Sequence, residues 1–166
     1  MEIQLLSNDY DVRRITNEDV EDVFQLCMKN LLYYEYCPPI VTRESIQRDL
    51  MALPPNTPIS DKYYVGFYQN SSLIAVMDLI DGYPQNGVAF IGFFMTDKSV
   101  QKKGIGTKII QGICIYLKKL GFNSIQLAWV KGNPQSEHFW LKNQFVKIKE
   151  TSSTVADNVI LAERLL

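Results

Sequence analysis

The chain has 166 residues, of which 46% are hydrophobic and 21% charged, a composition typical of one soluble domain with a buried core. Its 17 basic and 18 acidic side chains leave a net charge of −1, so it lacks the basic excess of a nucleic-acid-binding protein. No apolar run approaches the length of a membrane span, and the N-terminus does not resemble a secretory signal. We therefore expect one cytoplasmic domain over residues 1–166, without nucleic-acid or membrane partners.

The first half of the chain predicts two helices followed by three strands. Apolar residues recur at helical spacing over residues 20–31, behind Thr16, and over residues 46–53, behind Thr42. Pro54 and Pro55 end the second helix. Three β-rich runs follow at residues 62–68, 73–80 and 88–95, separated by turn sequences. They predict an antiparallel meander.

The second half alternates helices and strands. A helix from about Gly104 to Leu120 is followed by Gly121, which is expected to cap it in a left-handed conformation. A strand at residues 124–130, a short helix from about Pro134 and strands at 145–150 and 158–166 follow. The apolar stripe of the long helix consists of Ile105, Ile109, Ile113, Leu117 and Leu120. The order of elements predicts an α/β fold.

The chain has three cysteines and one histidine that could form disulfides or bind a metal ion. Cys27, Cys37 and Cys114 are widely spaced, and His138 forms none of the usual ligand patterns with them. We expect neither a disulfide framework nor a metal.

The stretch "SVQKKGIGTKII", residues 99–110, places Gly104 and Gly106 at the start of the long helix. The first amide groups of a helix have no partners inside it, so this helix start is a site for an anion. Such glycine-rich turns open helices in nucleoside triphosphatases, in dinucleotide-binding enzymes and in acyltransferases that hold coenzyme A.

The flanking residues separate these three classes. A triphosphatase loop needs a Lys-Ser/Thr pair after its second glycine, whereas Thr107 and Lys108 stand here in the opposite order. A dinucleotide site needs a small residue three positions after Gly106, where Ile109 stands, and a strand that ends closer to the first glycine. The sequence therefore favours an acyltransferase and leaves a nucleotide-binding regulator as a third alternative.

Two motifs carry a family resemblance. "QKKGIG", residues 101–106, resembles the Gln/Arg-x-x-Gly-x-Gly/Ala signature of the GCN5-related N-acetyltransferase (GNAT) superfamily. "NPQSEHFWLKNQF", residues 133–145, is similar to the family's Asn-x-x-Ala-x-x-Phe/Leu-Tyr-x-x-x-Gly-Phe. The resemblance spans roughly the whole chain. It implies a mixed, mostly antiparallel sheet flanked by helices, with a splayed pair of central strands, and acetyl-CoA as cosubstrate.

The resemblance also implies which residues hold the cosubstrate. Its pyrophosphate would bind the loop, and its pantetheine arm would pair with the splayed strand as an extra strand. Asn133 would bond the pantetheine arm or cap the following helix, and the lysines of the loop could equally be solvated. The implied residues are Phe94, Met95 and Thr96 on the strand and Gln101, Lys102, Lys103, Gly104, Ile105, Gly106 and Thr107 in the loop.

The sequence departs from the family at two catalytic positions. Trp140 stands in place of the tyrosine that commonly serves as the acid, and Phe90 in place of the glutamate on the fourth strand. Asp78 interrupts an apolar strand, and a turn centred near Pro84 would place it opposite Phe90, as a substitute base. The alternatives are that Asp78 is exposed at a strand end and that Trp140 is a core residue.

The acceptor would bind near "LLYYEYCPPIV", residues 31–41, where Tyr33, Tyr34, Glu35 and Tyr36 suit a small cationic amine. The same aromatic residues could instead pack the helices together. We expect an N-acetyltransferase that moves the acetyl group of acetyl-CoA to an amine of a small molecule or peptide, as a monomer or homodimer. The alternative is a non-catalytic acyl-CoA-binding module.

Overall fold

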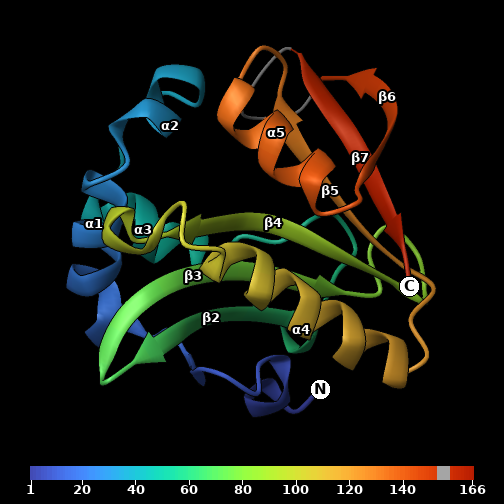
Figure 1. Cartoon of the computed structure of the whole chain (residues 1–166), viewed down its shortest axis with the longest axis horizontal. Coiled ribbons are helices and arrows are strands. Elements are labelled where there is room, and N and C mark those ends of the chain that lie inside the picture. Colours follow the sequence, from blue (N-terminus) through green and yellow to red (C-terminus); the bar gives the residue numbers. More distant parts are fainter. Residues whose placement is uncertain (153–157) are drawn as a thin grey trace.

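The computed structural model describes residues 1–152 and 158–166 as a seven-stranded sheet in the order β1-β2-β3-β4-β5-β7-β6 (Figure 1). All neighbouring strands are antiparallel except β4 and β5. The strands are β1 (Asp11–Arg14), β2 (Lys62–Gln69), β3 (Ser72–Asp81), β4 (Val88–Thr96), β5 (Ser124–Val130), β6 (Val146–Thr151) and β7 (Val159–Leu165).

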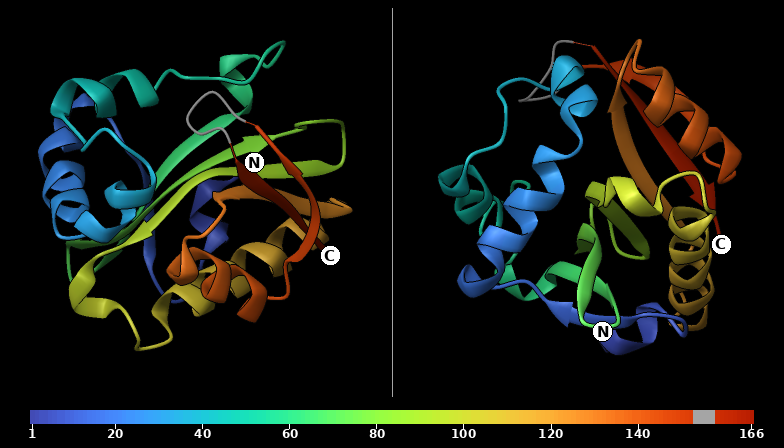
Figure 2. Two further views of the ribbon diagram at one scale, coloured as in Figure 1. Left: turned by 90° about the horizontal axis from the view of Figure 1, so that it is seen from above. Right: turned by 60° about the vertical axis from the view of Figure 1, so that its left-hand side comes forward.

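Helices cover both faces of the sheet (Figures 1 and 2). One hydrophobic cluster joins the sheet to α4 and α5, and a second joins it to α1 and α3. The helices are α1 (Val20–Met28), α2 (Leu31–Tyr36), α3 (Arg43–Asp49), α4 (Ile105–Lys119) and α5 (Pro134–Lys142), with short 3-10 turns η1 (Ile3–Leu6), η2 (Asn17–Asp19), η3 (Ile59–Asp61) and η4 (Lys98–Val100). Among the described residues, no helix is long and apolar enough to cross a membrane.

The predicted meander and the helix–strand alternation are confirmed, with differences at the ends of helices. The first helix stops at Met28, and Leu31 begins the separate helix α2. The helix after Thr42 ends at Asp49, short of the two prolines. Neither α2 nor β1 was predicted from the sequence, because neither has a clear apolar period over its few residues.

Helix α4 follows its apolar stripe closely. Ile109, Ile113 and Leu117 are fully buried, whereas Leu120, the last residue of the predicted stripe, is 47% exposed at the C-terminal cap. Gly121 has the expected left-handed backbone, with φ of 87°. The amide of Phe122 then donates to the carbonyl of Leu117 at 3.1 Å, which ends the helix as predicted.

The central strands β4 and β5 separate along their length. They pair in parallel only over Val88–Ile91 and Ser124–Leu127. Beyond these residues β4 continues to Thr96 and β5 to Val130, while β5 stays paired with β7 on its other side. The two strands therefore splay apart toward their C-terminal ends, as expected (Figure 1).

The register between β3 and β4 corrects the placement of Asp78. Asp81 lies opposite Ala89, and a β-bulge shifts the register between Asp78 and Leu79. Asp78 consequently faces Phe93, not Phe90, which lies opposite Ile80. The expected pairing was wrong because the connection is offset from Pro84 and because a bulge adds a residue to one strand.

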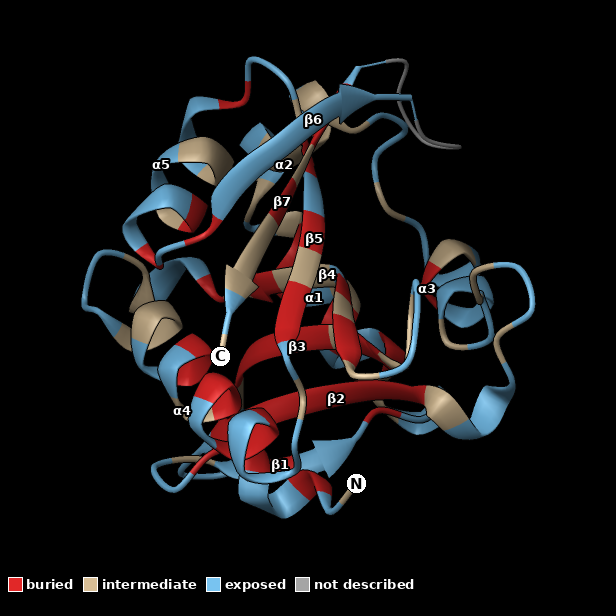
Figure 3. Ribbon diagram, turned by 90° about the vertical axis from the view of Figure 1, so that its right-hand side faces the viewer, coloured by how far each residue is buried: buried red, intermediate tan, exposed pale blue. Residues whose placement is uncertain are grey.

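The inner strands of the sheet and its β6 edge differ in burial. Strands β2 and β3 are buried along most of their length, whereas every residue of β6, at the edge, is exposed (Figure 3). The buried strands β2 and β3 thus support β4, which forms one wall of the gap between the splayed strands.

Candidate active site

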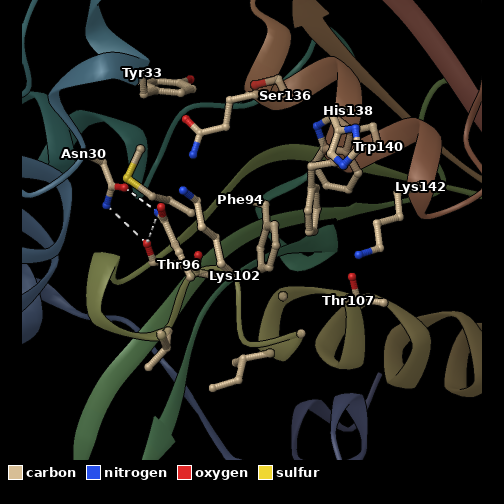
Figure 4. A pocket seen from close by; sticks show the side chains of 18 residues that line it. Asn30, Tyr33, Phe94, Thr96, Lys102, Thr107, Ser136, His138, Trp140 and Lys142 are labelled. Atoms are coloured by element: carbon tan, nitrogen blue, oxygen red, sulfur yellow. Dashed lines mark hydrogen bonds between the residues drawn. The ribbon is translucent and has the colours of Figure 1, made fainter.

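A groove of about 430 Å³ opens where β4 and β5 diverge (Figure 4). The end of β4, the glycine-rich loop, the first turn of α4 and helix α5 form its walls. The residues predicted from sequence that line this groove are Tyr33, Phe94, Met95, Thr96, Gln101, Lys102, Gly104, Ile105, Gly106, Thr107 and Trp140. Segments that lie far apart in sequence therefore meet at one site.

The backbone of β4 presents polar groups to this groove. The amide of Asp97 donates to the carbonyl of Ile74 on β3 at 2.8 Å. This bond determines which residues of β4 turn their backbone groups toward β3. Because bonded and non-bonded pairs alternate in antiparallel strands, the backbone groups of Met95 face β3, and those of Phe94 and Thr96 face the open side. The carbonyl of Thr96 accepts from the side chains of Asn30 and Gln101, each at 3.2 Å.

The start of α4 has the open geometry that the predicted anion site requires. Gly104 is left-handed, with φ of 79°, and the first intrahelical bond runs from the amide of Lys108 to the carbonyl of Gly104 at 3.0 Å. The amides of Ile105, Gly106 and Thr107 thus point out of the helix end. Lys102 lines the groove, whereas Lys103 is exposed outside its lining.

Gly106 has a packing role besides its place in the loop. A Cβ at this position would lie 3.1 Å from Cε2 of Phe139 and 3.4 Å from Cγ2 of Thr96. The glycine therefore lets α4, α5 and β4 approach one another closely. At Gly104 nothing lies within 4 Å of an added Cβ, so there the left-handed backbone alone favours glycine.

An aromatic cluster forms the α5 wall of the groove. Trp140 is 7% exposed and contacts Phe139, Phe94 and Phe145, with ring centroids 4.9, 6.0 and 5.2 Å away. Trp140 thus belongs to the core and lines the groove at the same time. Its indole N–H has no useful acidity at neutral pH, so this wall is an apolar surface for a ligand.

Asn133 has the capping role that the sequence suggested. Its Oδ1 accepts from the amide of Ser136 at 3.1 Å, at the start of α5, and the residue is 3% exposed. It lies outside the lining of the groove, so no contact in the structure bears on the pantetheine role that the resemblance implies.

Of the four predicted acceptor residues, only Tyr33 reaches the groove. Its ring packs edge-on against Tyr34 and Phe93, with centroids 5.1 and 5.7 Å away. Burial raises the pKa of Tyr33. Tyr34, Glu35 and Tyr36 stand on α2 outside the lining, because successive residues of a helix point in different directions.

Asp78 of β3 forms a buried ion pair with Lys62 of β2. Nζ of Lys62, whose side chain is 2% exposed, donates to Oδ1 and Oδ2 of Asp78 at 2.8 and 2.7 Å and to the carbonyl of Ala52 at 2.7 Å. Burial raises the pKa of Asp78. The positive charge of Lys62 lowers this pKa, and the negative charge of Asp49 raises it further. The side chain of Asp78, 16% exposed, is therefore mostly buried and lies outside the groove lining.

Gly92 leaves β4 without a side chain next to Asp78. Gly92 is exposed in the middle of β4, and a Cβ there would lie 3.1 Å from Oδ2 of Asp78. Phe93 follows on the same strand and packs against Tyr33 of α2. The carboxylate of Asp78 thus borders an open patch of sheet on the α2 side.

Several groove residues were not predicted from the sequence. His138 and Lys142 stand on α5, and Lys142 points toward Thr107 of α4 (Figure 4). The signal that could have found them is the helical spacing of Gln135, His138 and Lys142. The other missed residues are Asn30, Val100, Gln135, Ser136 and Phe139.

Splayed strands beside an open helix start match what the resemblance to the acyl-CoA-dependent acetyltransferases implied. The model of the Acetyltransferase (GNAT) family matches residues 23–145, and the chain belongs to this family. The protein is therefore an N-acetyltransferase that uses acetyl-CoA and an amine acceptor. No curated protein sequence matches the chain.

Solved structures share the fold at low sequence identity. An acetyltransferase from Thermus thermophilus has a TM-score of 0.80 and 16% identity, with 98% of this chain and 99% of that chain covered. A ribosomal L7/L12 alpha-N-protein acetyltransferase in complex with coenzyme A has a TM-score of 0.75 and 16% identity, with 99% and 98% covered. A spermidine N-acetyltransferase chimera from Vibrio cholerae and hSSAT has a TM-score of 0.71 and 17% identity, with 95% and 96% covered.

Proposed function

We propose that the enzyme acetylates a primary amine of a small molecule or peptide that approaches β4 from the α2 side, over Gly92, while acetyl-CoA occupies the groove. The observation that supports this most is the splay of β4 and β5, which turns the backbone groups of Phe94 and Thr96 toward the groove. Structures whose names mention a ribosomal protein and spermidine share the fold, and these names motivate the two classes of acceptor.

The groove fits acetyl-CoA chemically. The free N–H and C=O of Phe94 and the N–H of Thr96 suit the amides of a pantetheine arm, and the open amides at the start of α4 suit a pyrophosphate. Lys102 adds positive charge at the same end of the groove. The aromatic wall of Phe94, Phe139 and Trp140 excludes water from the acyl end.

Acetyl-CoA supplies an activated thioester, so the chain must position the amine and remove its proton. A primary amine has a pKa of about 10.4, and little of it is nucleophilic at neutral pH. In our proposal Asp78 accepts that proton directly or through water across the bare patch at Gly92, because it is the carboxylate that borders this patch. Lys62 holds the carboxylate in place from β2.

Trp140 shields the acyl end and donates no proton. A general acid or base contributes about 10²–10⁴-fold, so transfer can proceed without an acid at this position. Phe90 and Trp140 replace the two expected catalytic side chains, so proton transfer in this enzyme must rest on other groups.

The test measures thiol release from acetyl-CoA with a panel of peptides with free N-termini, polyamines and small monoamines. We expect amine-dependent release with one of these classes. The Asp78→Asn variant should lose about 100-fold or more in turnover, with unchanged affinity for coenzyme A. Tight coenzyme A binding without release for any amine of the panel would contradict the proposed acceptor classes.

A further inference from the structure

One amide side chain joins the first helix to the cofactor loop. Asn30 follows α1, and its Nδ2 donates to the carbonyl of Leu26 at 2.9 Å and to that of Thr96 at 3.2 Å. Its Oδ1 accepts from Nε2 of Gln101 at 2.6 Å (Figure 4). Asn30 therefore connects the end of α1, the end of β4 and the first residue of the glycine-rich loop.

A second contact at the same junction supports this connection. Nζ of Lys29 lies 2.7 Å from Oδ2 of Asp97, which is 6% exposed. Oδ1 of Asp97 accepts from the amide and hydroxyl of Ser99 at 2.8 and 2.6 Å, which fixes the turn η4 that leads into Gln101. The loop is thus held to α1 on both sides of η4.

The backbone of Asn30 contacts α2, the helix that carries the predicted acceptor residues. Its carbonyl accepts from the amide of Tyr33 at 3.0 Å, in the first turn of α2. Helix α2 has only six residues and none of them is fully buried, so its own hydrogen bonds stabilise it little, and its packing rests on the partly buried Tyr33 and Tyr34. The order of α2 therefore depends on this packing and on the junction at Asn30 that holds its first turn.

We propose that Asn30 is a positioning residue that couples occupancy of the cofactor groove to the order of α2. A ligand at the loop restrains Gln101, Gln101 holds Asn30, and Asn30 holds the first turn of α2, where Tyr33 lines the groove. The inference rests on the proposed function only in taking coenzyme A as the ligand. Because coupling between sites is reciprocal, an ordered α2 also favours coenzyme A binding.

The first test measures coenzyme A affinity by calorimetry. Asn30→Ala and Gln101→Met should each weaken binding about tenfold, the effect of removing one partner of a partly buried hydrogen bond. The double variant should be no weaker than either single variant, because both remove the same link. Gln25→Ala and Gln111→Met remove exposed amides from α1 and α4 and serve as controls that keep wild-type affinity.

The second test measures hydrogen exchange of the amides of residues 31–37 with and without saturating coenzyme A. Exchange should slow on binding in the wild type but not in Gln101→Met or Asn30→Ala at saturation. Equal slowing in these variants, or effects on affinity that add in the double variant, would overturn the proposal. A wild type that fails to bind coenzyme A would instead contradict the proposed function.

Discussion

The two sides of β4 differ in what the chain offers a ligand. On the β5 side the groove presents backbone groups of Phe94 and Thr96 and the open start of α4. On the α2 side the sheet presents side chains, with Asp78, Phe93 and Tyr33 around the bare Gly92. A site built from backbone can serve one invariant cosubstrate, whereas a site built from side chains can change its acceptor through substitution.

On the α2 side, we expect the largest effect on stability from variants of the Lys62–Asp78 pair. Lys62→Met leaves Asp78 as an uncompensated buried charge and should lower the free energy of unfolding by about 3–5 kcal/mol, measured in urea. The double variant Lys62→Met with Asp78→Asn should recover most of this loss. Lys131→Met breaks the exposed pair with Glu150 and should cost at most about 1 kcal/mol. A similar small loss for Lys62→Met would show that the pair is not buried in solution.

Gly106 tests the groove side. Gly106→Val inserts side-chain atoms where Phe139 and Thr96 already lie close, and should cost about 1–3 kcal/mol of stability. It should also weaken coenzyme A binding, since α5 and the end of β4 form the groove walls. Gly104→Ala has space for its methyl group and should cost about 1 kcal/mol from its left-handed backbone alone. Wild-type affinity in a folded Gly106→Val variant would contradict the assignment of the loop.

Trp140 lies where the core meets the groove. Trp140→Phe keeps an aromatic side chain but leaves space, and should cost about 1–2 kcal/mol of stability with turnover within a few-fold of wild type. Trp140→Tyr would introduce a hydroxyl and should raise turnover if protonation of the leaving thiolate limits the rate. A folded Trp140→Phe variant that binds acetyl-CoA normally but loses 100-fold or more in turnover would mean that the indole N–H takes part in catalysis.

The smallest expected effect concerns pH. A base must be ionised to act, so kcat/KM should fall as the pH drops through the pKa of Asp78, which burial raises. Asp49→Asn removes a negative charge that raises the pKa of Asp78 further, so the acidic limb of the pH profile should move to lower pH. Glu44→Gln removes an exposed acid from the same helix and should leave the limb in place. An acidic limb that persists unchanged in Asp78→Asn would exclude Asp78 as the titrating base.

The same comparison explains what the sequence could predict. The groove side depends on local signals, since Gly104, Gly106 and the stripe of α4 are contiguous and their spacing alone predicts a helix with an open start. The α2 side depends on contacts between distant segments. The offset connection and the bulge together move Asp78 from Phe90 to Phe93. Like the pairing of Asp78 with Lys62, they follow from tertiary packing that no local pattern in β2 or β3 encodes.

Asn30 shows the same limit within the groove. Its residue type suits the end of a helix, and nothing in the sequence links it to Gln101, which lies 71 residues further along the chain. His138 and Lys142 carried a weak signal through their helical spacing, but only the packing of α5 against α4 places them on the groove.

The most direct test of the central claim is an NMR titration of the uniformly ¹⁵N-labelled protein with coenzyme A. We predict the largest shifts for the backbone amides of Phe94, Thr96, Ile105, Gly106 and Thr107, which face the groove or the anion site. The amides of β6, at the far edge of the sheet, should not move. Saturable binding that leaves the amides of β4 and of the α4 start unchanged would contradict the claim that the splayed strands hold the cosubstrate.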